Sequence, residues 1–137
     1  MLRFVSLLLM SLLVFGNVNL VQAEEEAAPA NATQYIYLSP AFLVNYGSKG
    51  PLRYLRCEIA LKVSSMDASI KVDQHKPYLR NDLVLLLSAQ EPSSINTPEG
   101  REKLRKEALD AVRGRLMQLE GTPYVNDLYF SNFVVQN

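Results

Sequence analysis

The residues of this chain that could perform catalysis are few, and their spacing matches no catalytic motif. His75 is the single histidine, and no cysteine or cluster of acids lies near it in the sequence. A metal site needs several His, Cys, Asp or Glu ligands in register, and an α/β-hydrolase-type triad needs a serine on an elbow such as Gly-x-Ser-x-Gly. The six glycines form no phosphate-binding loop. The residues therefore predict no catalytic residue, no metal and no cofactor.

One enzymatic alternative stays open at this point. A hydrolase would require the fold to gather a cluster around His75, Ser88 or Asp82. The other reactive side chain is Cys57, the single cysteine, so no internal disulfide can form. Because Cys57 lies in a segment of alternating apolar residues, we predict a buried and unreactive thiol.

The N-terminus has the pattern of an export signal. Arg3 supplies a positive charge, residues 4–15 are apolar except for two serines, and Ala23 ends a possible cleavage site. A dozen residues span roughly 18 Å as a helix, less than the ~30 Å hydrocarbon core of a membrane. We predict a signal peptide over residues 1–23 and a periplasmic protein. The alternative is an anchor in the inner membrane formed by residues 4–21.

The remainder of the chain predicts a linker and one domain. Residues 24–33 (EEEAAPANAT) are acidic and small, which is typical of a flexible linker, and residues 34–137 suffice for a single core. Arg3 is one of 14 basic residues, so 13 basic and 14 acidic residues remain after cleavage, a net charge of −1. This balance gives no electrostatic support for binding nucleic acid.

Strands are predicted at both ends of the domain. Residues 35–38 and 41–46 read as two strand segments interrupted at Ser39-Pro40, and a turn over residues 46–51 leads into a strand over 52–64. In that strand the alternation directs one set of residues to the core: Arg53, Leu55, Cys57, Ile59, Leu61 and Val63. The last ten residues, 128–137, predict a mostly buried strand that closes the sheet.

Helices are predicted between these strands. Residues 66–75 fit either a strand or a helical start, Pro77 begins a helix, and the run at 83–87 predicts burial on most sides. Thr97, Pro98 and Glu99 begin a longer helix that Gly121 ends. Its apolar stripe is Leu104, Ala108, Val112, Leu116 and Leu119. Its opposite face is Arg101, Glu102, Arg105, Lys106, Asp110 and Arg113. We expect that face to be solvated, with partner binding as the alternative.

The predicted fold class is therefore α+β, with an antiparallel sheet packed against two main helices. Five stretches between residues 37 and 136 also carry a resemblance to a known family. They are LSPAFLVN (38–45), RYLRCEIAL (53–61), PYLRND leading to LLLS (77–88), TPEGREKLR (97–105) and LYFSNFVVQ (128–136). In this order they resemble the periplasmic domain of the FliL family of flagellar basal-body-associated proteins.

The resemblance implies a non-enzymatic accessory of the flagellar motor, with a fold similar to the stomatin/prohibitin (SPFH) type and no catalytic residues. It implies flagellar stator units as partners, a ring of identical copies, and no nucleic acid or small-molecule substrate. Family members usually carry a full transmembrane helix, whereas this leader is short. We therefore expect a soluble periplasmic paralogue, which a membrane-anchored FliL paralogue could accompany. The alternative function is an envelope scaffold with no motor role.

The leader gives a first test. If residues 1–23 are a signal peptide, the exported protein begins at or close to Glu24, and intact-mass measurement of exported protein will show this mass. Recovery of a chain that retains Met1 in an integral-membrane fraction would instead establish the anchor over residues 4–21.

Overall fold

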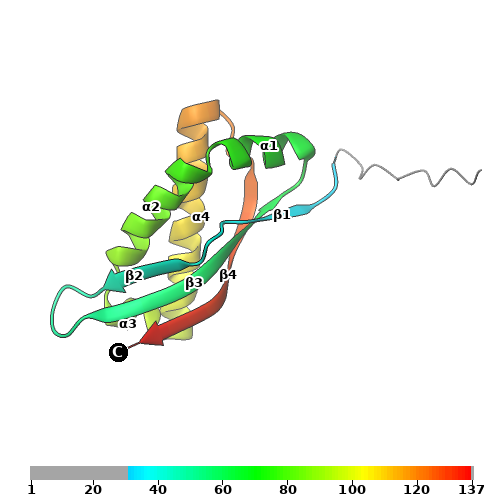
Figure 1. Cartoon of the computed structure of the whole chain (residues 1–137). Coiled ribbons are helices and arrows are strands. Elements are labelled where there is room, and N and C mark those ends of the chain that lie inside the picture. The colour runs from blue at the N-terminus through cyan, green and yellow to red at the C-terminus, as the bar shows by residue number, and fades with distance from the viewer. Residues whose placement is uncertain (1–30, 137) are drawn as a thin grey trace, which may run out of the picture.

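A computed structural model describes residues 31–136 of the chain. The predicted signal peptide, residues 24–30 of the predicted linker and the final Asn137 lie outside the described residues. The element order is three strands, four helices and a last strand. This is an α+β arrangement with an antiparallel sheet, as predicted (Figure 1). Similarity to the SPFH-type domain remains a prediction.

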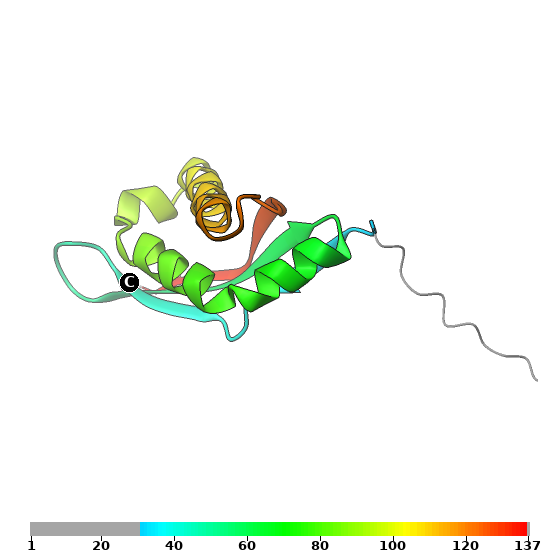
Figure 2. The same cartoon turned by 90° about the horizontal axis from the view of Figure 1, so that it is seen from above.

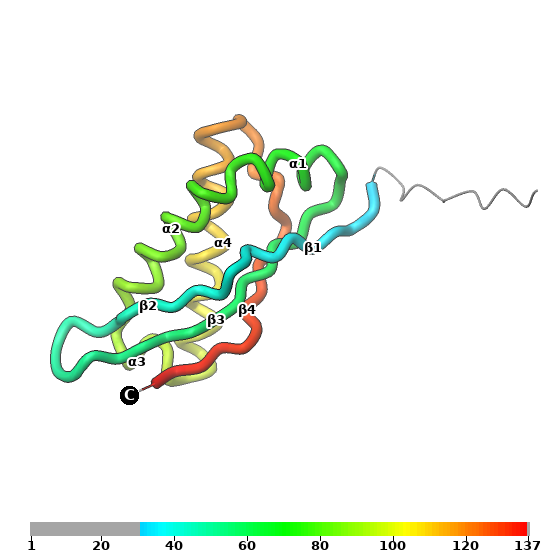
Figure 3. Tube along the Cα trace, viewed as in Figure 1, coloured from blue at the N-terminus to red at the C-terminus, as the bar shows by residue number. Residues whose placement is uncertain are grey.

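The sheet is built around the central strand β3 (Arg53–Val63). β4 (Val125–Gln136) pairs antiparallel with β3 along nearly its whole length. β1 (Gln34–Tyr37) pairs with one end of β3 and β2 (Phe42–Tyr46) pairs with the other end. The tube in Figure 3 shows β1 and β2 following one another along the same side of β3. They act as one strand interrupted at the cis peptide bond between Ser39 and Pro40, which is the predicted break.

The predicted alternation of β3 is confirmed at its apolar positions, whereas Arg53 of the predicted core-facing set is only half-buried. Leu55, Cys57, Ile59, Leu61 and Val63 are each no more than 1% exposed. Cys57 is the single cysteine, and burial raises the pKa of its thiol to about 12. A thiol held in its neutral form inside the core is a poor nucleophile.

Four helices follow β3. They are α1 (Met66–Gln74), α2 (Lys76–Ser88), α3 (Pro92–Ile95) and α4 (Pro98–Glu120). The segment that fitted either a strand or a helix is helix α1, because the Ser65 hydroxyl caps it by accepting a hydrogen bond from the Ala68 amide at 3.0 Å. Pro77 lies in the first turn of α2, as predicted.

The longest helix, α4, begins and ends where the sequence predicts. The Thr97 side chain accepts a hydrogen bond from the Gly100 amide at 3.0 Å, and Gly121 ends the helix in the left-handed conformation at φ 73°. Leu104, Ala108, Val112 and Leu116 are buried against the sheet. Figure 2, seen from above, shows α3 and α4 on one side of the sheet and no helix on the other.

Three burial predictions are wrong. In α2 the buried residues Leu79, Leu83 and Leu87 recur every fourth position, so Val84 and Leu85 point outward and are 38% and 62% exposed. Leu119 at the end of α4 is exposed as well. In β4 only Val125 and Leu128 are fully buried, because this strand lies at the edge of the sheet and α4 covers just part of it.

The cap of α4 predicts a measurable cost. Thr97→Ala should lower the free energy of unfolding by about 1 kcal/mol, because the Gly100 amide loses its side-chain acceptor. Thr97→Ser keeps a hydroxyl acceptor and should retain most of the parent's stability. Denaturant unfolding monitored by circular dichroism measures the difference. Thr122→Ala, at an exposed threonine just after α4, is the control and should be neutral. Equal effects of the two alanine substitutions would contradict the capping role.

Candidate interaction surface

The face of the sheet opposite the helices carries a cluster of tyrosines. Tyr37 on β1 and Tyr129 on β4 both lie directly across from Ala60 of β3, and Tyr35 lies on the same face two residues before Tyr37. The rings of Tyr35 and Tyr129 are 6.3 Å apart. These side chains leave Ala60 only 8% exposed although it belongs to the outward-facing set of β3. We call Tyr35, Tyr37 and Tyr129 the tyrosine cluster.

A second apolar patch lies further along the same face. Leu43 on β2 and Val134 on β4 flank Arg56 of β3, and they are 69% and 54% exposed. Between the two patches Glu58 forms an ion pair with Arg56 at 3.6 Å and accepts a hydrogen bond from Asn132 at 3.0 Å. Exposed apolar and aromatic patches rimmed by polar groups are typical of protein–protein contact surfaces.

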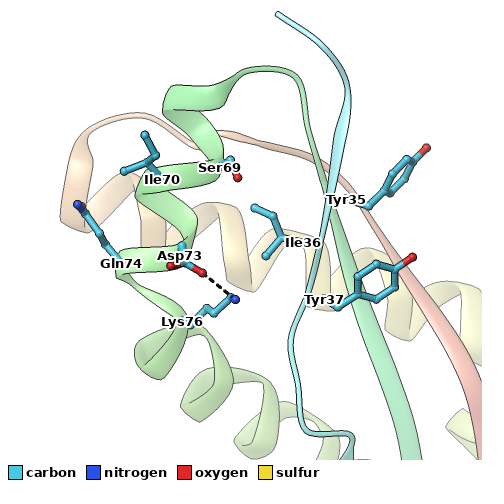
Figure 4. Close-up of a pocket in the computed structure, with 8 residues that line it drawn as sticks. All are labelled: Tyr35, Ile36, Tyr37, Ser69, Ile70, Asp73, Gln74 and Lys76. Atoms are coloured by element: carbon cyan, nitrogen blue, oxygen red, sulfur yellow. Dashed lines mark ion pairs between the residues drawn. The ribbon is translucent and has the colours of Figure 1, made fainter. Parts of the chain in front are cut away.

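A groove with a volume of about 570 Å³ lies between β1 and α1. Figure 4 shows Ile36 pointing into this groove toward α1, whereas Tyr35 and Tyr37 point away from it to the other side of β1. Asp73 and Lys76 form an ion pair with each other at 2.8 Å at the groove wall. The two charges of this pair neutralise each other at the groove wall.

The structure does not assemble the cluster that a hydrolase would need. The His75 Nε2 atom lies 2.7 Å from Glu120 Oε1, whereas Asp82 accepts two hydrogen bonds from Arg115 at 2.7 and 2.8 Å. Ser88 is exposed at the far end of α2, roughly 20 Å of helix away from His75. His75 and Asp82 therefore bind residues of α4, and the three side chains do not form a cluster.

No group of three or more His, Cys, Asp or Glu side chains within residues 31–136 could hold a metal ion. None of the helices that the structure describes is long and apolar enough to cross a membrane.

The predicted solvated face of α4 is partly a packing face instead. Arg105 forms ion pairs with Asp127 of β4 and with Glu102, both at 2.6 Å. Arg113 donates to the backbone carbonyl of Val125, and Arg101 donates to the backbone carbonyl of Ile95 at 2.8 Å. Three of the four basic residues on this face therefore bind neighbouring segments of the fold. The helical periodicity of the sequence alone does not predict these contacts.

One ionic cluster joins three helices at one end of the helical layer. At the end of α4, Glu120 pairs with His75 and also with Lys71 of α1 at 3.5 Å. The hydrogen bond from His75 holds the pKa of Glu120 below its usual range, with Lys71 acting in the same direction. This carboxylate connects α1, α2 and α4.

Comparison with known proteins identifies the family. A family model described as "Flagellar basal body-associated protein FliL" matches residues 35–136, nearly the whole of the described fold. The chain belongs to the FliL family. The flagellar protein FliL of Aquifex aeolicus (strain VF5) is 32% identical over 111 residues, which cover 81% of this chain and 66% of that protein. The chain thus matches slightly less than two thirds of the length of this FliL relative.

The five stretches that suggested FliL occupy the main elements of the fold. Residues 38–45 cover the break after β1 and most of β2, and residues 53–61 lie in β3. Residues 77–88 lie in α2, residues 97–105 begin α4, and residues 128–136 lie in β4. The tyrosine cluster was not predicted as a site. Its signal in the FliL-like sequence is the alternation of Tyr35 and Tyr37 around a core isoleucine.

The ion pair at Glu120 predicts a dependence of stability on pH. Because the pKa of Glu120 is lowered in the folded protein, its stabilising contribution is present above about pH 4.5, the ordinary value, and is lost as the pH falls through the lowered pKa. Glu120→Gln should therefore reduce stability at pH 7 and flatten its decline below pH 4.5. Urea unfolding across pH 3–7 measures both effects.

The control for this pH series is Glu107→Gln. Glu107 lies on the same helix, and its basic partner Lys103 is 3.9 Å away and largely exposed. This substitution should change neither the stability at pH 7 nor the slope. A slope for Glu120→Gln equal to that of the parent would contradict the assignment.

Proposed function

We propose that this chain is a non-enzymatic accessory protein of the bacterial flagellar basal body that supports stator engagement or torque through protein–protein contacts. The observation that carries this proposal is the FliL family match over residues 35–136, because it covers the elements of the fold rather than a short motif. The predicted export signal would bring the domain to the periplasm, beside the membrane that holds the motor.

The structure favours action by contact. The sheet has helices on one face only, and its other face presents the tyrosine cluster together with Leu43 and Val134 to the surroundings. Aromatic side chains bury a large area with few rotatable bonds, so they are enriched where proteins bind one another.

Flagellar stator units are the partners we propose, and a membrane-anchored FliL paralogue could act beside this chain. Several copies could form a ring through head-to-tail interfaces whose repeated rotation closes. In this arrangement the uncovered sheet face would be turned toward the stator or toward the neighbouring copy.

Motility of complemented cells tests the proposal. In a strain that lacks this gene and any anchored paralogue, the parent chain should restore swimming speed and stator number at high load while filaments assemble in all strains. The double substitution Tyr37→Ser and Tyr129→Ser should fail to restore them, because it removes two rings from the uncovered face. Bead assays on single motors measure both quantities.

Tyr78→Ser is the matched control, because Tyr78 is 55% exposed but lies on α2, away from the uncovered face. It should restore motility, and all variants should keep the melting temperature of the parent within a few degrees. If the double-deletion strain complemented with the paralogue alone matches wild type in speed and stator number, the motor role is wrong. The envelope-scaffold function would then replace it.

A further inference from the structure

Side chains of α4 bind the outer edge of β4 along its first part, and the backbone of the second part is unpaired on that side. Arginines of α4 donate to the backbone carbonyls of Val125 and Leu128, the latter at 3.2 Å from Arg105. No hydrogen bond of this kind reaches β4 after Leu128, and in the described sheet β4 pairs with β3 alone. Residues 129–136 also contain no charge and no proline, the features that usually protect an edge strand.

A β-bulge in this part of β4 changes which side chains lie on the same side of the strand. The register of β4 against β3 shifts between Arg56 and Glu58, and Asn132 has a positive φ of 48°. An extra residue in a strand changes which side chains share a face. As a result Phe130 and Phe133, three positions apart, lie on the same side with ring centroids 5.4 Å apart.

These two rings form one wall of a groove of about 410 Å³ between β4 and the start of α4. Arg101 forms part of the other wall. Its guanidinium carbon lies 4.7 Å from the centre of the Phe133 ring, and its Nε donates to the backbone carbonyl of Ile95 at 2.8 Å. The neighbouring Glu102 is already bound by Arg105 through two hydrogen bonds at 2.6 and 2.8 Å. Arg101 therefore has no carboxylate partner within residues 31–136.

We propose that residues 129–136 are a strand-addition site for an extended segment of a partner protein that carries an apolar side chain two residues away from a carboxylate. The unpaired edge would supply backbone hydrogen bonds, the groove beside Phe130 and Phe133 would take the apolar side chain, and Arg101 would bind the carboxylate. Side chains two apart on a strand share a face, which is why this spacing fits.

The chemistry of β4 argues against a second copy as the occupant. The one carboxylate of β4, Asp127, already pairs with Arg105, and residues 128–136 contain no aspartate or glutamate. A second β4 strand paired along this edge would fill the apolar groove but would leave the Arg101 guanidinium buried without a carboxylate, which costs free energy. This site lies beside the tyrosine cluster but does not depend on a motor role for the chain.

A labelled peptide tests the site directly. The probe is a fluorescein-labelled heptapeptide of threonine and serine in which a glutamate and a phenylalanine flank a central valine. Fluorescence anisotropy with the full-length chain should show saturable binding, and hydrogen exchange should show new protection confined to amides of residues 129–136. Arg101→Gln should weaken binding roughly tenfold, whereas Lys106→Gln, which removes a charge from an exposed position of the same helix, should leave it unchanged within about twofold.

Two altered peptides separate the parts of the proposal. N-methylation of the backbone amides removes strand pairing but keeps the side chains, and it should abolish binding. Glutamine in place of the glutamate should weaken binding to the parent but not to Arg101→Gln. Protection outside residues 129–136, or undiminished binding of the N-methylated peptide, would overturn the proposal. Failure of the probe to bind, with self-association in sedimentation that protects β4 instead, would also overturn it and make a second copy the occupant.

Discussion

The burial of one face of β3 is the constraint on which the rest of this structure depends. Every other strand pairs with β3, and five of its side chains, from Leu55 to Val63, are essentially inaccessible to solvent. Because side chains alternate along a strand, a shift of one residue would turn this apolar row to solvent. The register of β1, β2 and β4 is therefore tied to the position of β3 under the helices.

A sheet with helices on one face only must leave its other face to solvent or to a partner. In this chain the exposed face is polar in the middle and aromatic at one end, where the tyrosine cluster covers Ala60. A tyrosine ring can rest on a sheet while its hydroxyl stays hydrated, so the isolated domain can carry such a surface. The same architecture leaves an edge at β4, which the arginines of α4 close only in part. The surfaces proposed for function are thus consequences of a one-sided core.

The parts of the fold set by local chemistry were predictable from the sequence. The buried face of β3 was predictable because its apolar residues repeat with a period of two. The ends of α4 were predictable because the Thr97 side chain and the left-handed backbone of Gly121 each act within one helical turn. The FliL-like stretches gave the family for a similar reason, since they coincide with these regular elements.

The parts that depend on the arrangement of elements were not predictable. Exposure of Leu85 follows from the position of α2 at the outside of the helical layer, and partial burial of β4 follows from its place at the sheet edge. Likewise the tyrosine cluster requires the pairing of Ala60 with strands from opposite ends of the domain. Arg105 and Arg113 bind β4 although the helical pattern predicts that both side chains face solvent.

The central claim is that the uncovered sheet face is where this FliL-family protein meets its partner. Site-specific photocrosslinking in motile cells tests it most directly, with the crosslinking amino acid placed at Tyr37 on that face or at Lys106 on the solvent side of α4. We predict a defined adduct at Tyr37 that contains a flagellar basal-body component, and no such adduct at Lys106. An adduct with that component at Lys106 and none at Tyr37 would contradict the account.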